Sequence, residues 1–152
     1  MNDEELMRVA IEAARRSHVS GDVPVGALVI NQSGEIISIG HNERELHGDP
    51  TAHAEIVALR RASVKTKTWR LDDYTLVVTL EPCAMCAGAI AQARISTLIF
   101  GAWDEKAGAV GSVWDILRDP RSIFKVEVRA GVLEEECTVL LKDFIQGVRT
   151  KD

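Results

Sequence analysis

Two cysteines and a histidine are spaced so that they could hold one metal ion. Cys83 and Cys86 are about one helical turn apart, and His53 precedes Cys83 by 30 residues. Two thiolates and one imidazole suit zinc, because magnesium and calcium prefer ligand shells made only of oxygen. Structural zinc ions are normally closed by a fourth protein ligand, whereas catalytic ones keep one position open. The pattern therefore predicts one zinc ion per chain, in a site that is open for chemistry.

A carboxylate stands close to the predicted histidine ligand. Glu55 follows His53 by two residues. As a fourth ligand it would fill the open position and make the bound water less acidic, so it is better used beside that water to accept and return protons. Two residues apart on a regular helix, the side chains would point to opposite sides. The prediction of Glu55 as the catalytic residue therefore requires this pair to lie at a helix tip that faces a crevice.

Hydrophobic periodicity and turn residues divide the chain into helices and strands. The helical period predicts helices in residues 2–20, 50–63, 84–94 and 133–148. Apolar or alternating runs predict strands in residues 23–30, 35–40, 74–80, 95–100 and 125–129. The first two strands have the pattern of an antiparallel hairpin. We expect a polar loop in residues 43–49 and one helical turn in residues 113–117.

The predicted order of elements brings the cysteines to an edge of the sheet where ligands bind. The strand in residues 74–80, the helix in 84–94 and the strand in 95–100 follow one another with short connections. This order implies a parallel pair of strands with a right-handed crossover, and ligands of such sheets bind at the carboxyl ends of the strands. Cys83 and Cys86 then lie at a helix N-terminus, where the partial positive charge favours thiolates.

Length and composition are those of an ordinary globular chain. With 152 residues, of which 46% are hydrophobic and 27% charged, we expect one domain spanning residues 1–152. No apolar run approaches the roughly 18 residues needed to cross a membrane, and the first residues are acidic where a secretory signal would be basic. Three cysteines with this spacing are typical of metal or redox use in a reducing compartment. We therefore expect a cytoplasmic protein with no membrane partner.

Charge alone does not identify a partner. The formal net charge of −5 argues mildly against a nucleic acid, because phosphate binding usually requires a basic excess. Basic residues gather in residues 60–70 and again in residues 118–129. Each cluster is either a solvated face or a phosphate contact, and the sequence does not decide between the two.

Other reactive or aromatic residues have simpler interpretations. Cys137 lies on the apolar stripe of the predicted C-terminal helix, which favours a buried thiol over a fourth zinc ligand. Met85, between the two predicted ligands, is expected in the core. The glycine-rich segment 101–112 is long for a connector and is either a binding loop or a plain surface loop. Trp103 within it either stacks on a base or packs in the core or an interface.

The two motifs together are more specific than either alone. His-x-Glu followed by Pro-Cys-x-x-Cys is the established signature of the zinc-dependent nucleobase deaminases. In the mechanism that we expect, a zinc-activated water attacks the ring carbon that carries the amino group, while Glu55 moves the protons. Ammonia is then the leaving group.

Three segments of the sequence resemble the family of bacterial tRNA-specific adenosine deaminases. They are residues 49–56, residues 79–89, and the run from Phe100-Gly101-Ala102-Trp103-Asp104 to Gly111-Ser112. The resemblance extends, in matching order, from about Val23 to Phe144. The zinc motif identifies only the wider cytidine/deoxycytidylate deaminase superfamily, whereas Thr51-Ala52 before His53 and the Gly-Ala-x-Asp loop point to the tRNA branch.

The resemblance implies a fold, a reaction and a partner. The fold would be the three-layer α/β/α cytidine-deaminase-like fold, with a central mixed five-stranded sheet flanked by helices, and the protein would be a homodimer. The reaction would convert the wobble adenosine of an arginine tRNA anticodon to inosine, with no DNA substrate expected. The target base must leave its stack to enter the pocket, which an anticodon loop permits at lower cost than a duplex.

The same resemblance assigns residues by position. The zinc ligands would be His53, Cys83 and Cys86, and the proton shuttle Glu55. Asn42 matches a base-contacting asparagine. Asp104 matches an aspartate that touches the nucleic-acid backbone beside the flipped base.

The sequence departs from the family pattern at two places. Ile123-Phe124 stands where the family usually has Asn-His, and Ile145 follows Phe144 where a second aromatic residue is common. Both regions approach the RNA in that family.

Two other functions are alternatives to this interpretation. One is a deaminase of a free base or nucleoside, such as cytosine, cytidine or guanine, which would use the same zinc chemistry. The other is a non-catalytic zinc module that binds RNA, which would need a fourth ligand that the sequence does not offer.

Overall fold

The computed structural model describes the backbone of residues 1–151 and the side chains of residues 1–147. The first half of the chain contains α1 (Asp3–Arg15), the 3-10 helix η1 (Arg16–Ser20), β1 (Gly26–Ile30), β2 (Ile36–His41), α2 (Arg44–His47) and α3 (Ala54–Thr66). The second half contains β3 (Thr75–Leu80), α4 (Ala84–Gln92), β4 (Thr97–Ala102), β5 (Glu127–Arg129) and α5 (Glu134–Lys151). The side chain of Val148, expected on the last helix, and Asp152 lie outside the described residues. Among the described helices, none is long and apolar enough to cross a membrane.

The strands of the described chain form one mixed sheet in the order β2-β1-β3-β4-β5. β1 pairs antiparallel with β2 and β3, whereas β3, β4 and β5 run parallel. α4 connects β3 to β4, so the predicted parallel unit is confirmed. Leu80 pairs with Ala102, which places the carboxyl ends of β3 and β4 side by side. The segments that follow these strands therefore leave the sheet at the same edge.

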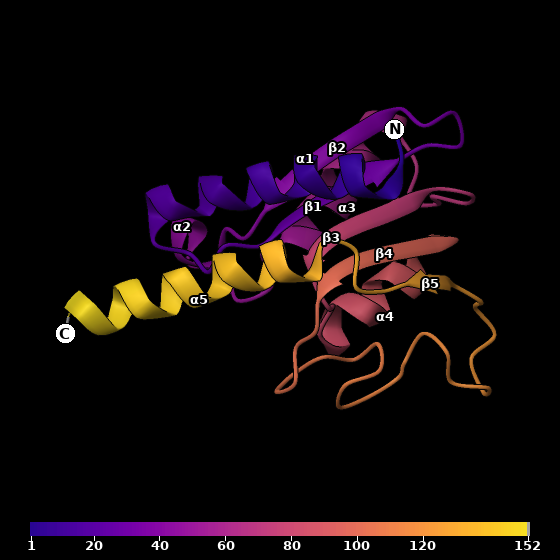
Figure 1. Cartoon of the computed structure of the whole chain (residues 1–152). Helices are drawn as coiled ribbons and strands as arrows, with labels where there is room; N and C mark the ends of the chain where they lie inside the picture. Colours follow the sequence, from indigo (N-terminus) through magenta and orange to yellow (C-terminus); the bar gives the residue numbers. More distant parts are fainter. Residues whose placement is uncertain (152) are drawn as a thin grey trace.

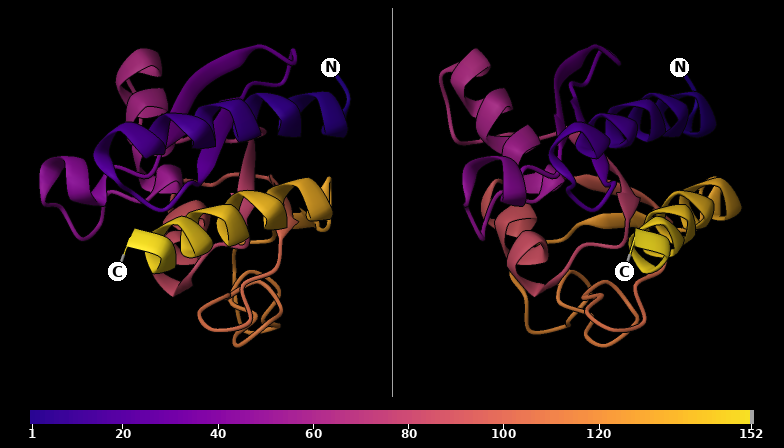
Figure 2. Two further views of the ribbon diagram at one scale, coloured as in Figure 1. Left: turned by 60° about the vertical axis from the view of Figure 1, so that its left-hand side comes forward. Right: turned by 90° about the vertical axis from the view of Figure 1, so that its left-hand side faces the viewer.

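Helices cover both faces of the sheet and complete three layers (Figure 1). On one face, α1 packs against β1 and β3, and α5 packs against β4. On the other face, α3 packs against β2 and β1, with α4 beside it. The right-hand view of Figure 2 shows the sheet between the two pairs of helices. The predicted α/β/α fold with a mixed five-stranded sheet is confirmed.

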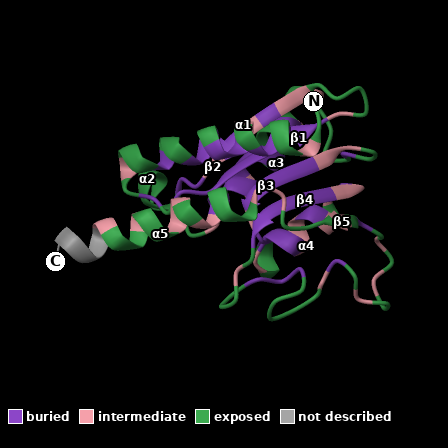
Figure 3. Ribbon diagram, in the orientation of Figure 1, coloured by how far each residue is buried: buried purple, intermediate pink, exposed green. Residues whose placement is uncertain are grey.

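Alternation along the strands divides the core between the two faces of the sheet. Val77 and Ile99 point to the side of α1 and α5, whereas Leu76, Val78 and Phe100 point to the side of α3 and α4. All five side chains are fully buried. Figure 3 shows the central strands as buried and the outer faces of the helices as exposed. Because both faces of the sheet are covered, its central strands are continuous apolar runs in the sequence.

Two glycines let helices pack directly onto the sheet. A Cβ atom on Gly26 would lie 1.9 Å from the carbonyl oxygen of Ala10 in α1, and one on Gly40 would lie 2.8 Å from the carbonyl oxygen of Ala54 in α3. Only a residue without a side chain permits such an approach of two backbones. The contact at Gly40 matters for the site, because it fixes the first turn of α3 against β2.

The structure departs from three predictions about local structure. Residues 43–49 are not simply a loop, because α2 forms one helical turn within them. The helix expected from residue 50 begins at Ala54, since Asp49 accepts a hydrogen bond from the Thr51 N–H at 2.9 Å and turns the backbone before it. Residues 113–117 contain no helical turn, because Asp115 pairs with Val110 in a β-bridge.

Candidate active site

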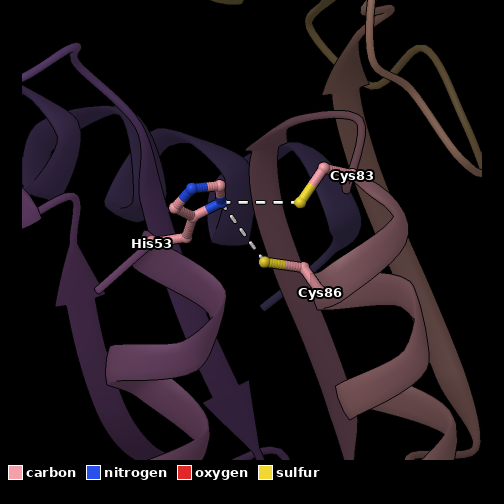
Figure 4. Close-up of side chains that lie close together, drawn as sticks. All are labelled: His53, Cys83 and Cys86. Carbon is pink, nitrogen blue, oxygen red and sulfur yellow. Dashed lines mark hydrogen bonds between the residues drawn. The ribbon is translucent and has the colours of Figure 1, made fainter. Parts of the chain in front are cut away.

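The side chains of His53, Cys83 and Cys86 point toward one another at one edge of the sheet (Figure 4). His53 Nδ1 lies 3.6 Å from Cys83 Sγ and 3.5 Å from Cys86 Sγ. Tetrahedral zinc, with Zn–N of about 2.0–2.1 Å and Zn–S of about 2.3 Å, separates such ligand atoms by about 3.5–3.6 Å. The three side chains therefore fit a zinc ion in both chemistry and spacing.

Two helix N-termini position these side chains. His53 is the N-cap of α3 and Cys83 is the N-cap of α4, and both have extended backbone conformations. Cys86 lies in the first turn of α4 and is fully buried. Because the first N–H groups of a helix carry partial positive charge, both helices favour anionic sulfur at this point.

The two thiols differ in their acidity. The neighbouring Cys86 thiol lowers the pKa of Cys83 to about 3, with help from His53, although burial opposes the change. The same contact with Cys83, together with burial, raises the pKa of Cys86. The contact with Cys83 also raises the pKa of His53. A divalent cation favours the ligand form of all three groups, because metal binding competes with protons and deprotonates a coordinating thiol.

Glu55 lies next to these ligands, in the first turn of α3, and is 4% exposed. His53 precedes the helix with an extended backbone, φ −67° and ψ 154°, so its side chain and that of Glu55 can face one crevice. Both residues line one cavity, so the pair lies at a helix tip that faces a crevice, as its proposed role requires. Burial raises the pKa of the Glu55 carboxyl to about 7. A carboxyl group with such a pKa can both accept and donate a proton near neutral pH.

A cavity of about 220 Å³ is lined by five of the six predicted site residues, all except the buried Cys86. His53, Glu55 and Cys83 line it with Asn42 and Asp104, which come from the end of β2 and the loop after β4. Sites for drug-sized ligands typically measure about 300–1,000 Å³, so this smaller cavity suits a single base.

Asn42 is fixed at both ends of its side-chain amide. Its Nδ2 donates to the Val23 carbonyl at 3.2 Å, and its Oδ1 accepts from the Arg44 N–H at 3.2 Å. One N–H and one lone pair of the amide remain for a ligand. Asn42 is therefore a rigid polar group on the wall of the cavity.

Two residues near the cavity were missed by the sequence prediction, namely Asp22 and Arg44. Asp22 is 1% exposed, and its carboxylate accepts hydrogen bonds from the Ser20 hydroxyl and from the N–H groups of Glu45 at 2.6 Å and Leu46 at 3.2 Å. This carboxylate caps α2, which carries Arg44 to the rim of the cavity. No motif in the sequence connects Asp22 with α2.

Comparison with known proteins identifies the family. The model of the MafB19-like deaminase family matches residues 1–149. The chain is 46% identical over 147 residues to a tRNA-specific adenosine deaminase from Haemophilus influenzae, and the match covers 97% of this chain and 85% of that protein. The chain belongs to the tRNA-specific adenosine deaminase family. The resemblance found in the sequence is thus confirmed.

Solved structures of related deaminases share the fold. One, from a study of A-to-I editing by tRNA:A34 deaminases at the wobble position, is 38% identical with a TM-score of 0.86, and the match covers 90% of this chain and 99% of that one. A guanine deaminase from Nitrosomonas europaea is 27% identical with a TM-score of 0.79, and the match covers 93% of this chain and 83% of that one. Deaminases of different substrates therefore use this fold, and the tRNA deaminase is the more similar of the two.

The remaining candidates from the sequence have mixed outcomes. Cys137 is 1% exposed and packs beside Gly101, so the prediction of a buried thiol is confirmed. Met85 is 38% exposed, so its predicted place in the core is wrong. Trp103 is 41% exposed and contacts Phe100 edge to face, which leaves part of its ring open at the start of the loop after β4. Base stacking by Trp103 stays a prediction.

Both basic clusters consist largely of arginines paired with carboxylates. Arg61 pairs with Glu43 at 3.1 Å, and Arg121 pairs with Asp119 at 2.7 Å. Similar pairs join Arg60 to Asp49, Arg70 to Asp72, Arg118 to Asp115 and Arg129 to Asp3. These pairs favour the interpretation of both clusters as solvated faces. Arg44 differs, because no carboxylate among the described side chains pairs with it.

Proposed function

We propose that the protein hydrolytically deaminates the wobble adenosine of a tRNA anticodon to inosine. The observation that carries the proposal is a His-Cys-Cys ligand set beside a buried carboxyl group, in a cavity that suits one base. Family membership supports the substrate, since the relative that is 46% identical is named a tRNA-specific adenosine deaminase. We take the substrate to be an arginine tRNA, as the resemblance of the sequence implies.

We assign the metal to zinc, with one ion per chain held by His53, Cys83 and Cys86. In the described part of the chain, these residues are the one group of His, Cys, Asp or Glu side chains arranged to hold a metal ion. Thiolate and imidazole ligands favour zinc over cations that prefer oxygen. When bound, zinc supplies Lewis acidity that lowers the pKa of a water ligand to about 7.

Glu55 is the residue that we propose to move protons. It accepts a proton from the water that attacks carbon 6 of the adenine and passes it to the adjacent ring nitrogen. It then takes the proton of the new hydroxyl group and delivers it to the departing amino group, which leaves as ammonia. The pKa of about 7 that burial gives to Glu55 suits a group that must accept and donate in turn.

Asn42 and Asp104 are the residues that we propose to bind the flipped nucleotide. Asn42 offers a fixed amide to the edge of the base. Asp104 lies at the start of the loop after β4 and borders the same cavity, where it can contact the nucleic-acid backbone beside the base. Arg44, also on the rim, offers a positive charge that suits a flanking phosphate.

Inosine formation on a synthetic arginine tRNA anticodon stem-loop with a wobble adenosine tests the proposal. Free adenosine, cytidine and guanine are run alongside with the same zinc-loaded protein, and a stem-loop with a wobble guanosine is the matched RNA control. We expect turnover only of the adenosine stem-loop, with a KM that rises with salt because phosphate contacts release counterions. Turnover confined to a free base or nucleoside would overturn the tRNA substrate.

We further propose that the protein acts in the cytoplasm, where tRNA is found, as a homodimer that uses the face formed by α3 and α4. A groove of about 790 Å³ runs between these helices and is lined mainly by apolar side chains, including Ile56, Leu59 and Ala89. Val64 and Trp69 border the groove and are 79% and 58% exposed. Contiguous exposed apolar surface of this kind is typical of protein interfaces. A second copy of the chain would cover it.

Size-exclusion chromatography with light scattering tests the dimer. Val64→Glu places a charge in the groove and should convert the dimer to a monomer. Val139→Glu is the matched control, because Val139 is 51% exposed on α5, away from the groove. A monomeric wild type, or a Val64→Glu variant that remains a dimer, would contradict this interface.

A further inference from the structure

Glu81 is a buried carboxylate that the proposed reaction does not use. It directly follows β3, precedes Cys83 by two residues and is 2% exposed. Its side chain lies against the loop after β4, the loop that brings Asp104 and Ala107 to the cavity. A charged group buried this deeply is normally paired or fully hydrogen-bonded, so its partners indicate what it holds.

Both carboxylate oxygens of Glu81 are occupied by that loop. Oε1 accepts hydrogen bonds from the Asp104 N–H at 3.0 Å and from the Ser112 hydroxyl. Oε2 accepts from the N–H groups of Val110 at 2.9 Å and Ser112 at 3.1 Å. One carboxylate thus ties the beginning of segment 104–112 to its end.

The loop closes tightly around this carboxylate. A Cβ atom on Gly108 would lie 2.3 Å from the Glu81 carboxyl group, so a side chain has no room there. Gly108 also pairs with Cys83 in a β-bridge, and the Ala109 N–H donates to the Pro82 carbonyl at 2.8 Å. The loop is therefore fastened to the short segment that leads from β3 into α4.

Asp104 is fixed from two directions by these contacts. Glu81 holds its N–H, and its own Oδ1 accepts hydrogen bonds from the N–H groups of Lys106 and Ala107, both at 3.1 Å. Among the described residues, no partner occupies its second carboxylate oxygen, Oδ2. The side chain is thus held in one orientation while one oxygen remains for a ligand.

We infer that Glu81 is a positioning residue for RNA binding, which holds segment 104–112 so that Asp104 meets the nucleic-acid backbone beside the flipped base. The inference rests on the proposed function, because such a contact exists only for a polynucleotide substrate. Glu81 also borders the cavity, but the loop occupies both of its carboxylate oxygens, so we infer that it acts through Asp104 and not on the reacting atoms. Its loss should therefore weaken RNA binding more than it slows the chemical step.

Glu81→Gln tests this link at the level of single atoms. A glutamine offers one oxygen and one NH2 group in place of two oxygens. With the oxygen facing the N–H groups of Val110 and Ser112, the NH2 group faces the Ser112 hydroxyl, which can accept, and the Asp104 N–H, which cannot. The substitution therefore releases Asp104 while the other end of the loop stays attached.

On the stem-loop, we expect Glu81→Gln to raise KM about tenfold, the cost of one charge-assisted hydrogen bond, with kcat within about threefold of wild type. Asp104→Ala should raise KM similarly, and the double variant should be no worse than Asp104→Ala alone. The Kd of a fluorescent stem-loop should change in parallel with KM. It is measured with zinc-loaded proteins that also carry Glu55→Ala, because this substitution blocks the reaction and leaves binding to be measured alone.

Asp119→Asn is the matched control, because Asp119 also accepts a hydrogen bond from a backbone N–H, that of Arg121 at 2.8 Å, but lies outside the cavity. An unchanged KM and Kd in Glu81→Gln, or effects of Glu81→Gln and Asp104→Ala that multiply, would overturn the inference.

A second variant tests the inference if Glu81→Gln does not fold. Ser112→Ala removes only one of the donors to Glu81 and should raise KM about twofold. An unchanged KM in Ser112→Ala counts equally against the inference. A wild type that does not edit the stem-loop would instead overturn the proposed function.

Discussion

The inner site and the rim of the cavity are held by different kinds of contact. The inner site consists of His53, Glu55, Cys83 and Cys86, and the rim consists of Asn42, Arg44 and Asp104. Each inner residue lies at the N-cap or in the first turn of a helix that packs on the sheet. The rim residues lie beside α2 and in the loop after β4, and two buried carboxylates, Asp22 and Glu81, hold those segments.

This difference separates chemistry from binding. The inner residues depend on the packed core, and the proposed reaction takes place at them, so their loss should lower kcat. The rim residues depend on a few hydrogen bonds and are the ones that we propose to contact the rest of the RNA, so loosening them should mainly raise KM.

Removal of a metal ligand should have the largest effect. Cys86→Ala leaves two ligands of three, and we expect zinc content well below one per chain and kcat reduced about 10³-fold or more, since a catalytic metal supplies several kcal/mol. Cys137→Ala is the matched control, because Cys137 is equally buried but does not belong to the group of side chains arranged to hold a metal ion. Zinc analysis and inosine formation measure both variants. Full zinc content and normal turnover in Cys86→Ala would show that the ligand set is wrong.

Substitution of the proton shuttle should come next and should leave the metal in place. Glu55→Ala and the isosteric Glu55→Gln should each lower kcat about 10²- to 10⁴-fold, the usual contribution of a general acid–base group, with zinc still near one per chain. Glu43→Gln is the control, since Glu43 is also 4% exposed but pairs with Arg61. Near-normal turnover in either Glu55 variant would remove this residue from the mechanism.

At the rim, Asp22→Asn should raise KM more than it lowers kcat. Asparagine offers one oxygen where the carboxylate accepts from Glu45, Leu46 and Ser20. α2 then loses part of its cap, at a cost of about 1–3 kcal/mol in the free energy of unfolding. Steady-state kinetics on the stem-loop should show a KM about threefold to tenfold higher. This increase corresponds to about half to all of the free energy that one hydrogen bond contributes. A fall in kcat with an unchanged KM would break the division between inner site and rim.

The stability effect of Asp22→Asn should depend on pH. Burial alone would raise the pKa of Asp22, but hydrogen bonds from Ser20, Glu45 and Leu46 outweigh it, and the pKa is lowered. A lowered pKa in the folded state gives stability that is complete above the unfolded-state pKa of about 3.9 and is lost as pH falls through the folded-state pKa. The difference in unfolding free energy between wild type and Asp22→Asn, measured with urea, should therefore shrink below about pH 4. A difference that grows on acidification would contradict this role of the carboxylate.

The same division explains which parts of the site could be predicted from the sequence. His53, Glu55, Cys83 and Cys86 lie in two short motifs, and the order of strand, helix and strand places the two cysteines at the edge of the sheet where ligands bind, so these residues could be selected from the sequence. The rim depends on contacts that no local pattern records. Asp22 caps α2 across 23 residues, and Glu81 holds Ser112 across 31 residues. The prediction of a helical turn in residues 113–117 was wrong for the same reason. Contacts with Val110 determine the conformation of that segment, through the bridge to Asp115 and the hydrogen bond that Arg118 donates to the Val110 carbonyl.

Residues 123 and 124, where the resemblance indicates a departure from the family pattern, lie at the opposite end of the sheet from the cavity. They border Ile95 and Ser96, just before β4, whereas the cavity lies beyond its carboxyl end. Six strand residues span about 20 Å. The guanidinium carbon of Arg94 lies 3.9 Å from the centre of the Phe124 ring, and Ile123 is 83% exposed. Within one chain, this segment belongs to neither the inner site nor the rim.

Restoring the family residues at these positions should therefore have the smallest effect. Phe124→His should lower the free energy of unfolding by about 0.5–1 kcal/mol, through weaker stacking on Arg94, and Ile123→Asn should leave it unchanged. Neither should change the KM for the stem-loop more than about twofold, the limit set by a surface position without a site contact. A tenfold change would mean that the bound RNA contacts this end of the sheet. Within one chain, this end is too far from the cavity, so the contact would have to come from the partner protomer. The monomeric Val64→Glu background decides between these cases, because an effect that comes from the partner must disappear there.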